Sequence, residues 1–132
     1  MKTIHTSGKR KEAVARATLT KGSGKVRINK ALLETISPPA ARLKIEEPLL
    51  LAEGIGEIDL QVSVRGGGVS SQVEAARLAI AKALVEFSKD KELEGRLLSY
   101  NRQLLVADVR RKEASKPNRH GQARAKRQKS YR

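Results

Sequence analysis

Residues 57–88 read EIDLQVSVRGGGVSSQVEAARLAIAKALVEFS, and this stretch decides the fold because two periodicities meet at three glycines. From Ile58 to Arg65 apolar and polar residues alternate, which is typical of a strand with one buried face. After the glycines, apolar residues recur at steps of three and four, which predicts an amphipathic helix with the stripe Val73, Ala76, Ile80, Leu84 and Phe87. Ser71 followed by Glu74 fits a capping box at the start of that helix.

Weaker patterns precede this unit. Residues 13–28 predict a β-hairpin whose turn is Gly22-Ser23-Gly24. Asn29 is expected to cap a short helix in KALLETI, residues 30–36. A longer helix is expected from Pro38, because proline is tolerated in a first turn, and Pro48 should kink or divide it before Gly54 and Gly56 end it.

After the central unit, KELEGRLLSY (residues 91–100) predicts a further helix and RQLLVADVR (residues 102–110) a final strand. Taken together, the elements predict an α+β fold, a mixed β-sheet with helices packed on one face.

Charge divides the 132 residues into a body and a tail. Residues 1–27 carry eight bases and one acid, residues 28–108 carry ten bases and twelve acids, and residues 109–132 carry ten bases and one acid. We therefore expect a globular body at 1–108 and an extended basic tail at 109–132. Small residues separate the cations of the tail, so a thin extended chain could pass through a narrow space and pair its arginines with phosphates.

Three groups of residues are candidates for nucleic-acid contact. For the basic tail, an idle, solvated terminus is the alternative, and an anionic membrane is less favoured because no amphipathic helix or lipid anchor accompanies the cations. The glycine loop could present N–H groups to a phosphate or be a simple turn, and the N-terminal cations could be a solvated strand end. The candidates are Lys9, Arg10, Lys11 and Arg16; Arg65, Gly66, Gly67 and Gly68; and Arg110, Arg111, Lys112, Lys116, Arg119, Arg124, Lys126 and Arg127.

Catalysis and metal binding find no support in the sequence. There is no cysteine, and the two histidines, His5 and His120, each lie in a basic segment. We expect no enzyme activity, no cofactor, no metal and no small-molecule substrate. The apolar runs are shorter than a membrane helix or a signal peptide requires, so a soluble cytoplasmic protein with no membrane partner is expected. Two rival functions remain: a small-molecule kinase using GGGVSSQ as a phosphate loop, and a free DNA-binding protein.

Three motifs resemble the family of the ninth protein of the small ribosomal subunit: GKRKEAVARATLTKGSGKVRIN (8–29), VRGGGVSSQVEAARLAIAKAL (64–84), and LLVADVRRKE (104–113) with ARAKRQKSYR (123–132). The KSYR ending is similar to the archaeal and eukaryotic branch of that family. Valine stands at position 109, where the family pattern leads us to expect proline.

The resemblance implies a fold shared with the second domain of small-subunit protein five. It implies a structural, translation-supporting role in the head of the small subunit. The implied partners are small-subunit rRNA, other head proteins and the peptidyl-site tRNA, which the tail would approach. The residues implied to contact that tRNA are Lys129, Ser130, Tyr131 and Arg132.

Overall fold

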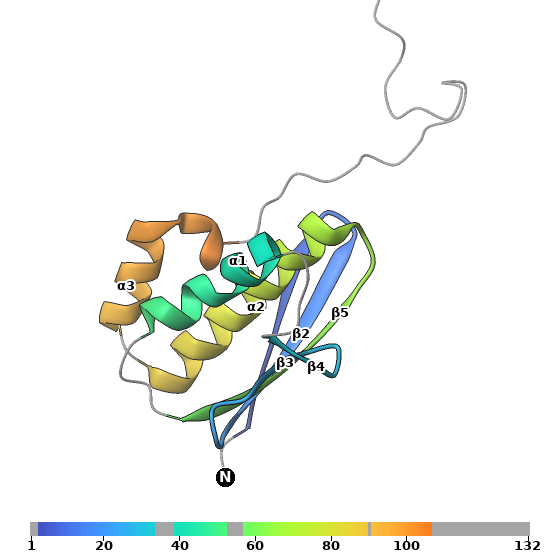
Figure 1. Ribbon diagram of the computed structural model, residues 1–132. Helices are drawn as coiled ribbons and strands as arrows, with labels where there is room; N and C mark the ends of the chain where they lie inside the picture. Colours follow the sequence, from blue (N-terminus) through green and yellow to red (C-terminus); the bar gives the residue numbers. More distant parts are fainter. Residues whose placement is uncertain (1–2, 34–38, 53–56, 90, 107–132) are drawn as a thin grey trace, which may run out of the picture.

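The computed structural model describes residues 3–33, 39–52, 57–89 and 91–106, and these fold into one sheet and three helices (Figure 1). The strands are β1 (Ile4–Arg10), β2 (Ala13–Lys21), β3 (Val26–Ile28), β4 (Ala31–Leu32) and β5 (Ile58–Arg65). The helices are α1 (Pro39–Leu51), α2 (Val69–Ser88) and α3 (Lys91–Tyr100), followed by the 3-10 turn η2 (Arg102–Leu104).

The sheet is mixed, with the strand order β1-β2-β5-β3-β4. β2 pairs antiparallel with both β1 and β5, whereas β3 runs parallel to β5 and antiparallel to β4. The helices cover one face of the sheet (Figure 1), so the predicted α+β architecture is confirmed.

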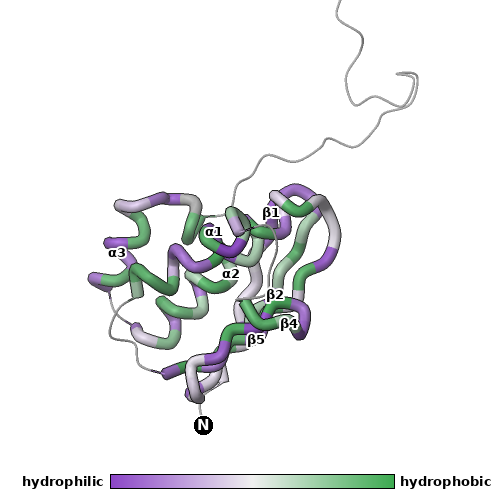
Figure 2. The backbone as a smooth tube through the Cα atoms, in the orientation of Figure 1, coloured by the Kyte–Doolittle hydropathy of each residue, from purple (hydrophilic) through white to green (hydrophobic). Residues whose placement is uncertain are grey.

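Alternation in the strands creates the core. In β5, Ile58, Leu60, Val62 and Val64 are buried against the helices, as predicted. In β2 every second residue from Ala13 to Leu19 is buried in the same way. Apolar and polar positions also alternate along the tube of α2 (Figure 2), whose predicted stripe packs on the sheet.

Small residues let α2 approach the sheet closely. Gly8 in β1 lies under α2, where an added Cβ would be 2.4 Å from the carbonyl oxygen of Ala75 and 2.8 Å from the backbone nitrogen of Ala79. The Thr6 hydroxyl donates a 2.7 Å hydrogen bond to the carbonyl of Ala79. The alanines on both sides therefore permit a short helix-to-sheet distance, and β1 is fixed directly beneath α2.

The predicted hairpin of residues 13–28 is wrong in its pairing. β2 and β3 are not neighbours, because β5 lies between them. The hairpin that forms is β1–β2, closed by Lys11 in the left-handed conformation at φ 53°.

Asn29 caps no helix, because Ala31 and Leu32 form β4 instead. Its φ is 49°, its amide Nδ2 donates to the carbonyl of Val64 at 3.3 Å, and its Oδ1 accepts from the Val64 N–H at 2.8 Å. The side chain thus continues the parallel ladder after β3 ends. Residues 34–36 of the expected short helix lie outside the described residues.

Two further expectations concern helices. α1 runs through Pro48 undivided, with that ring buried; Gly54 and Gly56, predicted to end the helix, lie outside the described residues. The predicted final strand is wrong where it is described, because Arg102–Leu104 form η2 and bury Leu104. The helix predicted at residues 91–100 is confirmed as α3.

Candidate nucleic-acid interface

The face of the sheet opposite the helices carries alternate residues of all five strands, and we call it the open sheet face. Strand register places its members in rows across the strands: Lys9, Val14 and Arg65; Ser7, Arg16 and Ser63; and His5, Thr18, Gln61, Arg27 and Leu32. Thr20 and Asp59 complete it at the far end. Most of these side chains are polar or cationic and accessible to solvent.

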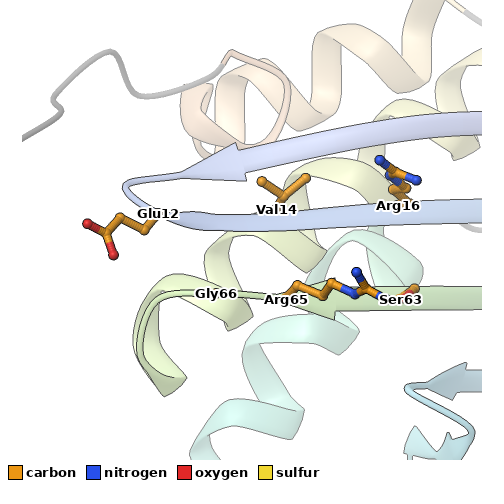
Figure 3. A pocket seen from close by; sticks show the side chains of 6 residues that line it. All are labelled: Glu12, Val14, Arg16, Ser63, Arg65 and Gly66. Carbon is orange, nitrogen blue, oxygen red and sulfur yellow. The ribbon is translucent and has the colours of Figure 1, made fainter.

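A shallow concavity of about 380 Å³ lies at one end of this face (Figure 3). It is lined by Glu12, Val14, Arg16, Ser63, Arg65 and Gly66. Arg16 and Arg65 come from neighbouring strands and are diagonal neighbours, because Arg16 is opposite Ser63 and Val14 is opposite Arg65. Diagonal neighbours are about 7–8 Å apart, so one phosphate group could contact both guanidinium groups.

Neither the guanidinium of Arg16 nor that of Arg65 has a hydrogen-bond or ion-pair partner among the described residues. The helix-facing arginines differ in this respect. Arg10 donates to Glu74 at 2.6 Å, and Arg77 donates to Glu47 at 2.6 Å. The cations inside the fold are thus neutralised by acids, whereas the two arginines on the open sheet face remain available to an external anion.

Asp59 is the one acidic residue in the five strands described, and its carboxylate already has hydrogen-bond partners within the fold. Its carboxylate accepts hydrogen bonds from the backbone N–H groups of Ser23 at 3.1 Å and Lys25 at 3.2 Å. The N–H of Lys25 is the main cause that holds the pKa of the Asp59 carboxyl below its ordinary value of 3.8. Asp59 therefore orders the loop before β3 and does not neutralise the arginines at the other end of β5.

The glycine loop packs against the β1–β2 turn. Gly66 and Gly67 have φ values of 78° and 63°, and a Cβ on Gly66 would be 2.5 Å from the carbonyl oxygen of Glu12. Gln72 donates from Nε2 to the Gly66 carbonyl at 3.1 Å. Both glycines are therefore required for a left-handed, tightly packed turn.

The predicted capping box at Ser71 does not form. The N-cap of α2 is Gly68, it makes no side-chain cap, and the helix begins at Val69, so Ser71 already lies inside the first turn.

The fold brings some sequence-predicted site residues together and separates others. Lys9, Arg16, Arg65 and the loop Gly66–Gly68 gather at one end of the open sheet face, with Lys11 in the adjoining turn. Arg10 lies on the helix side and is bound to Glu74, so it is left out of the interface proposed below. The candidates from Arg110 to Arg132 lie outside the described residues.

Sequence reasoning did not select several members of the open sheet face. Arg27 belongs to it through its register with Gln61, and Ser7 and Ser63 flank Arg16 directly. The signal that could have found them is the two-residue alternation, which assigns each strand residue to one face.

Charge is distributed unequally between the two layers. The five strands carry six bases, counting Arg10, and one acid, whereas each of the three helices described carries two bases and two acids. The excess positive charge of the body therefore belongs to the sheet, as a surface for a polyanion requires.

The described residues give no support for a metal site or a membrane-spanning helix. Among the described residues, no three His, Asp or Glu side chains gather where they could hold a metal ion. Within the same residues, no helix has both the length and the apolar composition needed to cross a membrane.

Comparison with known proteins identifies the family. The sequence profile of the family described as Ribosomal protein S9/S16 matches residues 8–132. This chain belongs to the ribosomal protein S9 family. Proteins named "Small ribosomal subunit protein uS9" are 53% identical in Methanococcus vannielii and 52% identical in Methanococcus maripaludis strains C5 and C7. Each alignment spans 134 positions and covers all of both chains.

The family match confirms the resemblance seen in the sequence, and the archaeal relatives agree with the predicted archaeal and eukaryotic branch. The names of the family and of the relatives describe ribosomal proteins, not enzymes, in agreement with the expected absence of catalysis.

Proposed function

We propose that this protein is a structural constituent of the small ribosomal subunit that binds small-subunit rRNA through its open sheet face. The family match over residues 8–132 supports the ribosomal role. The observation that carries the RNA-binding surface is the pair Arg16 and Arg65, which have no partner among the described residues, beside a concavity on a cationic sheet. Arginine binds phosphate in a planar, two-pronged geometry, so the pair suits an RNA backbone.

The tail extends the same interface. Ten bases between Arg110 and Arg132 would neutralise rRNA phosphates and release counterions, which brings compact RNA helices together. Its last four residues, Lys129 to Arg132, would reach the peptidyl-site tRNA in the head of the subunit. Such contacts hold phosphates and sugars and do not read base sequence, as a site that accepts every tRNA requires.

Co-sedimentation tests the ribosomal role. The tagged chain should remain with small subunits after a high-salt wash, because a chain enclosed by folded rRNA dissociates slowly even though each phosphate contact weakens as salt rises. Quantitative release of the chain at moderate salt, or its absence from the small-subunit fraction, would refute this assignment.

Deletion of Lys129–Arg132 tests the division of labour between body and tail. Subunits that contain the shortened chain should assemble normally and bind tRNA more weakly at the peptidyl site. Substitution of Arg132 alone by Gln, without shortening the chain, separates the loss of charge from the loss of reach. Failure of the head to assemble with the shortened chain would contradict the proposed division.

A further inference from the structure

The chemistry of the open sheet face is cationic and hydroxyl-rich. Ser7 and Ser63 lie on either side of Arg16 in one row, and Thr18 and Gln61 follow in the next row. No hydrogen bond among the described residues engages the hydroxyl of Ser7 or Ser63. The row therefore offers two hydroxyls and a guanidinium, all available to an external hydrogen-bonding partner.

Phe, Tyr and Trp side chains are missing from the open sheet face among the residues that the structure describes. Within the part of the chain that the structure describes, the Phe and Tyr residues are Phe87 in α2 and Tyr100 in α3, both on the helix layer. His5 contributes the imidazole of the face, and its Nδ1 lies 3.2 Å from the hydroxyl of Thr18 at the β1 edge. Proteins that hold single-stranded RNA on a sheet stack successive bases on aromatic side chains, and this sheet presents no such series.

Building on the proposed rRNA-binding function, we propose that the open sheet face binds double-helical RNA through phosphates and 2′-hydroxyls across the minor groove. A-form RNA has a wide, shallow minor groove that displays 2′-hydroxyls, which serine and threonine hydroxyls can pair with. The row Ser7–Arg16–Ser63 crosses three strands and is therefore about 10 Å wide. The minor groove of B-form DNA is only about 6 Å wide, so this surface selects the RNA duplex.

In this arrangement, cations at different places on the open sheet face contact different phosphates. Arg16 and Arg65, with Lys9 in the same row as Arg65, contact phosphates at the concavity. Arg27 lies two strands away from Arg16 and one row further along, at about 12 Å, so it reaches a different phosphate. Ser63, which lies between Arg16 and Arg27, and Ser7, on the other side of Arg16, face the sugars.

Binding of the full-length chain to three probes tests the proposal. The probes are a 20-base-pair RNA duplex, one of its strands alone and the DNA duplex of the same sequence, followed by fluorescence anisotropy over a range of salt concentrations. The test variant is Arg16→Gln with Arg65→Gln. The matched control is Lys44→Gln with Arg96→Gln, which removes two exposed cations from α1 and α3. All four substituted side chains lie at the surface, and thermal unfolding verifies that both variants fold.

The tail binds every polyanion, so the comparison is between variants on the same probe. Loss of the phosphate contact that the two arginines share should weaken duplex RNA binding by roughly tenfold near 0.1 M salt and reduce the log–log salt slope by about one. Single-strand binding should change no more in the test variant than in the control. Ser7→Ala with Ser63→Ala should lower the preference for RNA over DNA duplex by roughly threefold to tenfold, because two hydroxyl contacts are lost.

Equal losses on duplex and single-stranded RNA, or equal losses in the test and control variants, would overturn the inference. Equal losses on the two RNA probes leave the proposed function standing, provided that the chain still co-sediments with small subunits. Equal losses in the test and control variants would also remove the open sheet face from the proposed function, while the ribosomal role would still rest on co-sedimentation. A chain that bound duplex RNA but was absent from small subunits would instead refute the proposed function.

Discussion

Substitution of Gly8 by alanine should destabilise the fold because β1 and α2 are in close contact at this residue. The new Cβ would lie 2.4 Å from the Ala75 carbonyl oxygen, whereas an ordinary contact begins at 3.4 Å, so α2 must move by about 1 Å. Overpacking of this kind costs about 1–3 kcal/mol. The shift also weakens the hydrogen bond from Thr6 to Ala79, which contributes about 1 kcal/mol.

Alanine offsets part of this cost, by about 0.5–1 kcal/mol, because it restricts the unfolded chain more than glycine does. The net expectation for Gly8→Ala is a loss of about 1–3 kcal/mol in the free energy of unfolding, or roughly 4–11 °C in Tm for a chain of this size. Urea and thermal unfolding of the full-length chain, followed by circular dichroism, measure both quantities.

Gly95 provides the matched control. It lies in α3, and a Cβ there would meet nothing within 4 Å. Gly95→Ala should therefore raise stability by about 1 kcal/mol, because alanine is the better helix former. The two identical substitutions have opposite expected signs. A Gly8→Ala variant within about 0.5 kcal/mol of the parent would show that α2 does not constrain β1, and the reasoning from close packing would fail.

Three further predictions concern contacts that order the sheet. A double-mutant cycle on Arg10→Ala and Glu74→Ala should give a coupling energy of about 1–2 kcal/mol, since this 2.6 Å pair is partly buried; additive effects would contradict it. Asn29→Ala should cost about 2–3 kcal/mol in urea unfolding, because it leaves the Val64 N–H without its acceptor. Because the pKa of Asp59 is lowered in the folded chain, its stabilising contribution is present above the unfolded pKa and is lost as the pH falls through the folded value. Asp59→Asn should therefore lower stability at pH 7 and leave a shrinking difference from the parent as the pH falls below about 4, and a difference independent of pH would refute this.

Elements with a strict periodicity were predictable from the sequence, and those that depend on tertiary contacts were not. β5, α2 and α3 each have a clear alternation or apolar stripe. β1 lacks one, because three of its four helix-facing positions are Thr6, Gly8 and Arg10. Glycine is there because α2 approaches closely, and arginine is neutralised by Glu74, so both exceptions depend on a helix more than 60 residues away.

The order of the strands in the sheet also could not be predicted from the local sequence. Gly22-Ser23-Gly24 favours a tight turn, and a hairpin is the nearest way to pair the two segments that it joins. The insertion of β5 between them gives β2 a longer partner, over the eight residues from Val14 to Lys21, which no local signal specifies.

The candidate site was predictable from the sequence wherever the sequence shows on which face of the sheet a residue lies. Arg16 and Arg65 alternate with buried residues in well-defined strands, so their direction follows from the sequence. Lys9 and Arg10 are adjacent in β1 and must lie on opposite faces, so the sequence alone could not justify assigning both to one RNA surface. Arg10 is the residue that points toward the helices, where its guanidinium pairs with Glu74 of α2.

The central position of β5 has a consequence for synthesis of the chain. The strands on its two sides, β2 and β3, leave the translating ribosome before it, and neither can form its pairing with β5 until residues 58–65 emerge. At about 5–20 residues per second, the interval between the end of β3 and the end of β5 is roughly 2–7 seconds. During that interval the nascent chain exposes unsatisfied strand edges and cationic segments, a state suited to early capture by a chaperone or by nearby RNA.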